Sequence, residues 1–205
     1  FSYINHSLKS FRSLQELTLR LQNLGKEPDA GSQHIGQSLK ALTSLQSLTF
    51  NIGNVFFLTN TGLSSLSQGI KRLSMLKKLN LSLEFLFMVT CVGFNCLGKS
   101  LRRLDLLEEV SLNFAYSSTT DLRLSHFIGS FGRLGSLKSF SLDLGFGNQI
   151  NDEDLYSLGK ILEEFVFLVD LRLSFPGNKQ ITDAGLSRLG EGFGRLGSLK
   201  NFNLD

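Results

Sequence analysis

The feature that most constrains the fold of this chain is a pattern that returns with a period of 31 residues. In each copy a leucine is followed by apolar residues three and five positions later, and in all but the last copy seven positions later. The copies start at Leu14, Leu45, Leu76, Leu107, Leu137, Leu168 and Leu199. The successive intervals are 31, 31, 31, 30, 31 and 31 residues. Intervals this regular predict an array of similar units, each too small to close a core alone.

The hydrophobic period changes within each unit. After the leading leucine, apolar and polar residues alternate, as in Leu45 followed by Leu48, Phe50 and Ile52. This alternation predicts a strand with one buried face. Before each leading leucine, apolar residues stand three, six, ten and usually thirteen positions back, and Ser32 is the one polar exception at the last of these. That spacing predicts an amphipathic helix of about three turns.

Stacking of such units predicts an α/β solenoid in which residues 1–205 form a single array of about six and a half repeats. The strands would form a parallel sheet on the concave face and the wider helices would cover the convex face, which gives a horseshoe. The spacing typical of the helices already begins at Ile4 and Leu8, and the array stops within a strand at Asp205. Neither end has the polar terminal unit that protects a solenoid. We therefore expect a segment of a larger protein that self-associates when isolated.

One repeat resembles the leucine-rich repeats of ribonuclease-inhibitor-like proteins. It reads Leu171-Arg172-Leu173-Ser174-Phe175, then Asn178-Lys179-Gln180-Ile181-Thr182-Asp183-Ala184-Gly185-Leu186, and its turn returns in part from Asn148 to Leu155. The period exceeds the roughly 20–29 residues usual for the family and looks like the long variant of protist arrays. The turn asparagine is replaced in several repeats, for example by Val55 and Leu86. The resemblance implies protein recognition, usually on the concave face.

We expect no catalytic residues, cofactor or metal site. His34 and His126 lie three repeats apart, about 14 Å at roughly 4.8 Å per strand, which is too far to share a metal. Cys91 and Cys96 are too few for a disulfide framework, which favours a reducing, cytoplasmic compartment. The net charge of +3 is too small to predict nucleic-acid binding. No stretch approaches the roughly 18 apolar residues of a membrane span, so we expect no membrane insertion.

Basic residues recur where the helices should end. Arg72, Arg103 and Arg133 occupy matching positions in three consecutive repeats. One interpretation is electrostatic, because the helix dipole favours a cation at a helix C-terminus by about 0.3–1 kcal/mol. The other is a basic edge that binds an acidic partner. Both stay open, and the three arginines are candidate partner-binding residues.

The outward positions of the strands predict a weak binding surface. They form a ladder of mostly small polar residues, such as Thr49, Asn80 and Ser111, with two arginines and no aromatic residue. Energetically dominant interface residues are enriched in Trp, Tyr and Arg. We therefore do not expect a tight grip on a partner by this stretch of the concave face.

Two strand-to-helix loops differ from the others because they are apolar. They read Val55-Phe56-Phe57-Leu58 and Phe85-Leu86-Phe87-Met88-Val89. Alignment on the strands places Phe56 beside Phe87 and Phe57 beside Met88, so the two loops should form one patch. One inward position per loop, taken by Leu58 and Val89, cannot absorb all these side chains. We predict that five residues contact another protein: Phe56, Phe57, Phe85, Phe87 and Met88. The alternative is that the rings fold over the adjacent helices and are buried.

The sequence thus favours a non-catalytic module for protein–protein interaction or scaffolding in a larger assembly, with a protein partner and no small-molecule substrate. One alternative is a GTPase regulator similar to the Ran GTPase-activating proteins, which share this repeat type. Such a regulator needs a charged surface that engages the GTPase, and the ladder, whose residues are mostly small, polar and mixed in sign, does not provide one. The other alternative is an immune-type sensor whose nucleotide-binding domain lies outside this sequence.

Overall fold

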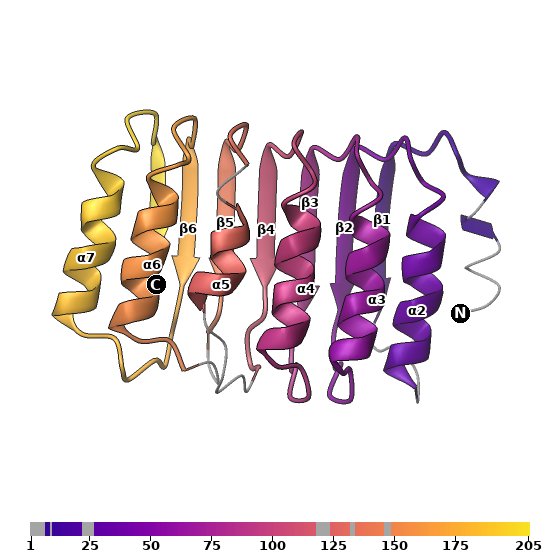
Figure 1. The fold of residues 1–205 in the computed structure, drawn as a ribbon, viewed down its shortest axis with the longest axis horizontal. Helices are drawn as coiled ribbons and strands as arrows, with labels where there is room; N and C mark the ends of the chain where they lie inside the picture. Colours follow the sequence, from indigo (N-terminus) through magenta and orange to yellow (C-terminus); the bar gives the residue numbers. More distant parts are fainter. Residues whose placement is uncertain (1–6, 9, 22–26, 118–123, 132–133, 146–148) are drawn as a thin grey trace.

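Strands and helices alternate along the computed structural model, which describes residues 7–8, 10–21, 27–117, 124–131, 134–145 and 149–205 (Figure 1). The strands are β1 (Glu16–Leu21), β2 (Ser47–Ile52), β3 (Lys78–Leu83), β4 (Glu109–Asn113), β5 (Ser139–Asp143), β6 (Asp170–Ser174) and β7 (Asn201–Leu204). The α-helices are α2 (Pro28–Leu39), α3 (Asn60–Ile70), α4 (Cys91–Leu101), α5 (Leu124–Ile128), α6 (Asp152–Leu162) and α7 (Asp183–Phe193).

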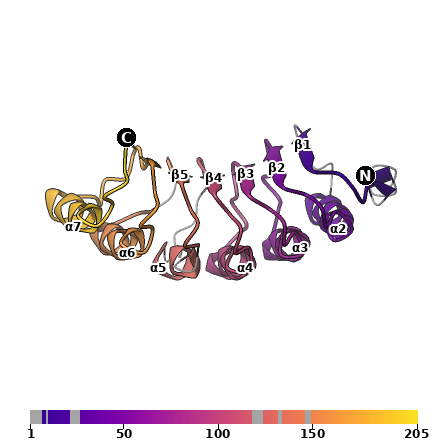
Figure 2. The same ribbon diagram turned by 90° about the horizontal axis from the view of Figure 1, so that it is seen from above.

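The seven strands form one parallel sheet in which their order in space is their order in the sequence. Each residue pairs with the residue one repeat later, so Leu17 faces Leu48 and Leu48 faces Leu79. Because residues one repeat apart are paired across the sheet, equivalent side chains of successive repeats form continuous columns. Figure 2 shows the sheet on the inner side of an arc and the helices on its outer side. The fold is the predicted α/β leucine-rich repeat solenoid, with an open sheet on the concave face.

Adjacent helices approach closely where glycine faces glycine. A Cβ atom at Gly69 of α3 would lie 2.5 Å from the carbonyl oxygen of Gly36 in α2. At the other end of the array, a Cβ atom at Gly192 of α7 would lie 2.3 Å from the carbonyl oxygen of Gly159 in α6. Both distances are shorter than a van der Waals contact, so a larger residue at these positions would push the helices apart.

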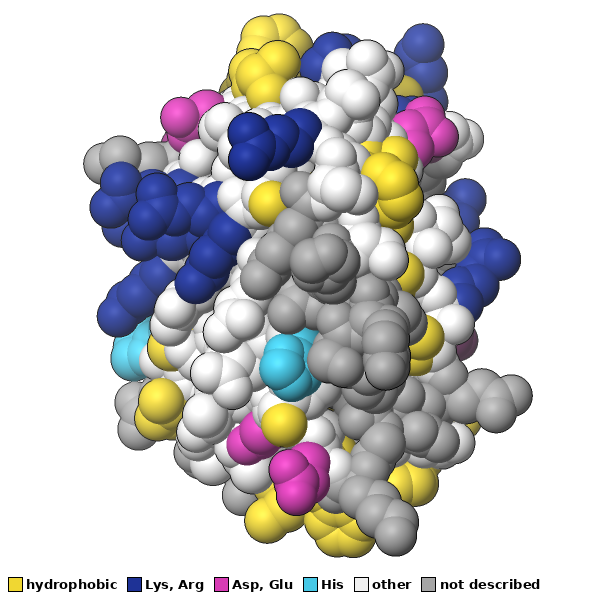
Figure 3. All heavy atoms as spheres, turned by 90° about the vertical axis from the view of Figure 1, so that its right-hand side faces the viewer, with side chains coloured by type: hydrophobic (Ala, Val, Ile, Leu, Met, Phe, Trp, Pro, Cys, Tyr) yellow, Lys and Arg dark blue, Asp and Glu magenta, His cyan; other side chains and the backbone are white. Residues whose placement is uncertain are grey.

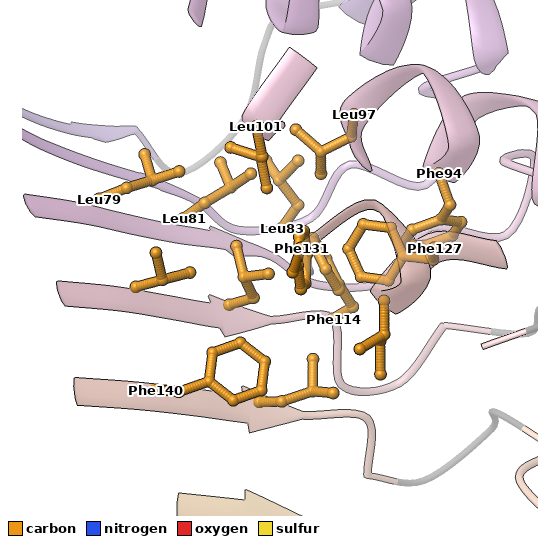
Figure 4. Packing of buried hydrophobic residues seen from close by; sticks show 14 of the residues in the cluster. Leu79, Leu81, Leu83, Phe94, Leu97, Leu101, Phe114, Phe127, Phe131 and Phe140 are labelled. Atoms are coloured by element: carbon orange, nitrogen blue, oxygen red, sulfur yellow. The ribbon is translucent and has the colours of Figure 1, made fainter. Parts of the chain in front are cut away.

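The columns of strand and helix residues meet in one core that runs along the array. Its centre contains a chain of buried phenylalanines, most of them labelled in Figure 4: Phe94, Phe114, Phe127, Phe131, Phe140 and Phe165. Neighbouring rings meet edge to face with centroids 5.1 to 5.9 Å apart. This geometry suits the quadrupoles of aromatic rings, and burial of each such side chain contributes roughly 1.5–3 kcal/mol.

The helix of the fourth repeat does not end as a regular α-helix. Within the described residues, α5 (Leu124–Ile128) continues as a 3-10 turn, Gly129–Phe131. Phe127 and Phe131 fill columns in which the neighbouring helices α4 and α6 have leucine. The larger rings need more room beneath the helix. Their extra volume works against a regular α-helix at this point.

Polar side chains at the start of one helix hold the start of the next. The backbone N–H and the hydroxyl of Thr59 donate hydrogen bonds of 2.9 and 2.5 Å to the Asp29 carboxylate. Thr182 donates to Asp152 in the same way, at 2.8 and 2.6 Å. The pKa of Asp152 lies below its ordinary value, chiefly because the Thr182 hydroxyl donates to its carboxylate. These bonds link successive repeats on the side where the helices begin.

Candidate protein-binding surfaces

All strand-to-helix loops lie along one edge of the sheet, because parallel strands end on the same side. The loops after β2, β3 and β4 place a row of large apolar side chains at this edge. We call the row the aromatic edge, and it consists of Phe56, Phe57, Phe85, Phe87, Met88 and Tyr116. In the space-filling view, hydrophobic side chains gather at the lower end of the molecule, where these loops lie (Figure 3).

The loops divide their apolar residues between the core and the surface. Four of them are buried: Val55, Leu58, Leu86 and Val89. The inward positions predicted for Leu58 and Val89 are therefore confirmed. The exposed fractions of the others are 39% for Phe56, 69% for Phe57, 48% for Phe87 and 51% for Met88. These four side chains are not buried within the solenoid.

The rings of the three loops contact one another. The centroid of Phe85 lies 5.2 Å from that of Phe56, 6.1 Å from that of Phe87 and 5.1 Å from that of Tyr116. Phe56 and Phe87 are 5.8 Å apart. The Phe85 and Tyr116 rings are stacked, with an interplanar angle of 15°. Four rings thus form a connected cluster across three consecutive repeats, with Phe85 at its centre.

Two of these rings are attached to left-handed backbone. The φ angle is 63° at Phe85 and 57° at Tyr116. The equivalent residues of other repeats are Asn54, with a φ of 54°, and Gly177, with a φ of 76°. Glycine and asparagine accept this conformation, whereas in other residues it costs roughly 1–2 kcal/mol. The turn demands the same backbone in these repeats, and two of them place an aromatic residue on it.

The sequence pattern did not single out Tyr116, because its loop is not a continuous apolar run. Tyr116 stands nine positions after Leu107, as Phe85 stands nine after Leu76. Alignment of the loops by column would have found it. The side chain of Tyr116 is 46% exposed.

Basic side chains gather toward the opposite edge, where the helices end. Figure 3 shows Lys and Arg side chains clustered on its left, which is the helical side of that view. Arg72 follows the end of α3 and Arg103 follows the end of α4, and both are exposed. Arg133, the third predicted arginine, lies outside the described residues. A groove of about 700 Å³ between these helix ends has five lining residues: Lys71, Lys99, Arg102, Arg103 and Asp105.

The concave face is polar and shallow, as the outward ladder predicts. Lys78 forms an ion pair with Glu109 at 2.7 Å, and the hydrogen bond to that carboxylate raises the pKa of Lys78. The pair borders a depression of about 220 Å³ that also includes Thr49, Asn80 and Ser111. These small side chains offer no aromatic anchor to a partner.

The described residues contain no group of three or more His, Cys, Asp or Glu side chains that could hold a metal ion. Cys91 and Cys96 both lie in α4 and are partly exposed. Over the same described ranges, every helix is too short or too polar to cross a membrane.

No protein-family model matches the chain, and no curated protein is significantly similar to it. Similar chains do occur among solved structures. One comes from an octameric complex of Latrophilin 3, Unc5D and a leucine-rich repeat region of FLRT2; it is 15% identical with a TM-score of 0.29, over 95% of this chain and 80% of that chain. Another is a leucine-rich repeat protein of Leptospira interrogans, 16% identical with a TM-score of 0.24, over 96% and 79% of the two chains. Likenesses this distant say nothing about the surfaces, and the fold class follows from the repeat, the register and the strand order.

Proposed function

We propose that this chain is a non-catalytic protein–protein interaction module and that a protein partner binds its aromatic edge. The observation that carries the proposal is the backbone of Phe85 and Tyr116. Asparagine or glycine at either position would remove the backbone strain of the left-handed conformation. A polar residue there would also remove exposed apolar surface, which lowers solubility. Backbone strain tends to be kept where it serves function. Binding of a partner that covers the rings would explain why aromatic residues occupy these two positions.

The geometry of the cluster suits recognition. Rings that already contact one another lose little side-chain freedom on binding, which lowers the entropic cost of an interface. Phe57, the most exposed ring of the aromatic edge, and Met88, with its flexible side chain, add apolar area beside the cluster. Covering apolar surface contributes about 25 cal/mol per Å² before the costs of association. A few such residues can supply most of the affinity of an interface.

We further propose that the module is a scaffold of the ribonuclease-inhibitor-like repeat type and belongs to a larger cytoplasmic assembly. It would bind neither a cofactor nor a small-molecule substrate. The turn of the sixth repeat supports the subtype. The Asn178 side chain accepts a hydrogen bond from the Ile150 N–H at 2.9 Å and donates one to the Phe175 carbonyl at 2.8 Å. The small number of cysteines, Cys91 and Cys96, supports a reducing compartment.

Affinity purification with quantitative proteomics tests the proposal. The bait would be the chain itself, the double variant Phe57→Ser with Phe87→Ser, and the control Phe167→Ser. Phe167 is 61% exposed but lies in a helix-to-strand turn, at the edge opposite the aromatic edge. We expect at least one protein to be enriched with the chain and with the control, and lost with the double variant. An unchanged set of enriched proteins with the double variant would contradict the proposal.

A further inference from the structure

The groove between the ends of α3 and α4 holds a cluster of unneutralised positive charge. Four of its lining residues are cations, all exposed, and Asp105 is the one acid among them. In the part of the chain that the structure describes, the ion pairs involve other residues and leave these four cations unpaired. Like charges held close together repel one another, so the groove favours an anion.

The ends of α6 and α7 offer a matched comparison within the same array. The carboxylate of Glu163, which follows α6, forms ion pairs with Lys160 at 3.0 Å and with Arg195 at 3.4 Å. The first of these bonds is also the main reason why the pKa of Glu163 is lowered. Basic side chains at this pair of helix ends are therefore neutralised from within the chain. In the described part of the chain, the cations that line the groove at the ends of α3 and α4 are not.

The helix dipole does not account for this difference. It favours cations at every helix C-terminus, and Lys40, Arg72, Arg103 and Arg195 follow α2, α3, α4 and α7, whereas Glu163 and Glu164 follow α6. A structural requirement of the repeat would recur in every repeat. The ends of α3 and α4 differ in carrying two consecutive cations each, Lys71-Arg72 and Arg102-Arg103, where α2 and α7 are followed by one. This distribution is that of a local surface rather than of the fold.

We propose that the groove binds an acidic segment of a protein partner, separately from the aromatic edge. The planar guanidinium groups of Arg102 and Arg103 match carboxylates, with which arginine forms paired hydrogen bonds. Exposed Met75 and Leu106 lie in the turns that follow α3 and α4. Such apolar side chains suit a peptide, which has apolar groups of its own to pack there. Single-stranded nucleic acid would instead call for aromatic rings on which bases stack, and the lining residues include none.

Fluorescence anisotropy with a labelled oligo-glutamate peptide tests this inference. The chain would be compared with a triple variant, Lys71→Gln with Arg102→Gln and Arg103→Gln. The matched control, Lys160→Gln with Arg195→Gln, removes two cations at the ends of α6 and α7. We expect saturable binding that weakens as salt is raised, since screening shortens the reach of exposed charges. The triple variant should bind about tenfold more weakly or worse, and the control within about twofold of the unaltered chain.

A labelled oligo-glutamine peptide and a single-stranded DNA oligonucleotide complete the experiment. We expect neither to bind as tightly as oligo-glutamate. Absence of oligo-glutamate binding, insensitivity to salt, an equal loss in the control variant, or tighter binding of DNA would each overturn the inference. If the triple variant loses its circular-dichroism signal, the single variant Arg103→Gln, which lies outside the helix, replaces it under the same criteria. The double variant of the aromatic edge should bind the peptide normally, so the two proposed surfaces can fail independently.

Discussion

Phe85 and Leu86 are adjacent in one loop, yet their side chains lie in opposite environments. Leu86 is buried in the core, whereas Phe85 is partly exposed on left-handed backbone. We expect Phe85→Gly to change the free energy of unfolding by less than about 1 kcal/mol, because relief of the backbone offsets the lost ring contacts. Leu86→Ala should lower it by roughly 2–5 kcal/mol through the cavity it leaves. Urea unfolding measures both. If the two substitutions destabilised the fold equally, the result would show that Phe85 serves the stability of the fold, contrary to this prediction.

A second prediction at this scale concerns Asp152. The folded chain holds its pKa below the ordinary value of 3.8, so its carboxylate stabilises the fold above that pH. This contribution is lost as the pH falls through the folded-state pKa. Asparagine can make similar bonds, as Asn60 does by accepting the Thr90 N–H at 2.9 Å. We therefore expect Asp152→Asn to lose less stability on acidification than the unaltered chain, measured as urea midpoints from neutral pH to about pH 3. An identical pH dependence in the two chains would contradict this.

Among the elements, the helices are the most sensitive to added volume. Gly69→Ala should lower the free energy of unfolding by roughly 1–3 kcal/mol, because the new methyl group meets the backbone of Gly36. Gly190 in α7 provides the control, since a Cβ atom there would meet nothing within 4 Å. Gly190→Ala should raise stability by about 0.5–1 kcal/mol through helix propensity. The two substitutions are chemically identical, so a fall in stability for both would count against the predicted close helix packing.

The periodicity of the sequence was sufficient to predict the strands, the helices and the side of the sheet that the helices cover. Columns of leucine specify these features directly, because burial of one face repeats at a fixed spacing. The 3-10 turn that follows α5 was not predictable in this way. Phe127 and Phe131 satisfy the helix columns as well as leucine does, and the consequence of their extra volume depends on neighbouring rings such as Phe94 and Phe114. Volume is a property of the packed core rather than of the pattern.

The candidate surfaces were predictable only in part, for a related reason. Apolar loops identified Phe56 and Phe87, but the left-handed backbone under Phe85 and Tyr116 becomes evident only when the turns are built. The row of arginines identified the basic edge. Its groove also depends on Lys99, which lies within α4 and outside the columns that follow the helix ends. That no ion pair among the described residues includes these cations is also a three-dimensional property.

At the scale of the whole molecule, the parallel topology separates the two proposed surfaces. Strand-to-helix loops lie at one edge of the solenoid and helix ends lie toward the other, so the aromatic edge and the basic groove can be occupied at the same time (Figures 1 and 3). A scaffold benefits from this arrangement, because one rigid array can then hold two partners or two segments of one partner.

Photo-crosslinking tests the central claim most directly. Benzoylphenylalanine would be placed at Phe57 in the aromatic edge, at Asn80 on the concave face and at Phe167 at the opposite edge, in cells that express the protein. We predict a covalent adduct with another protein from position 57 and none with that protein from positions 80 and 167. Adducts from position 80 without any from position 57 would contradict the claim and return the binding surface to the concave face.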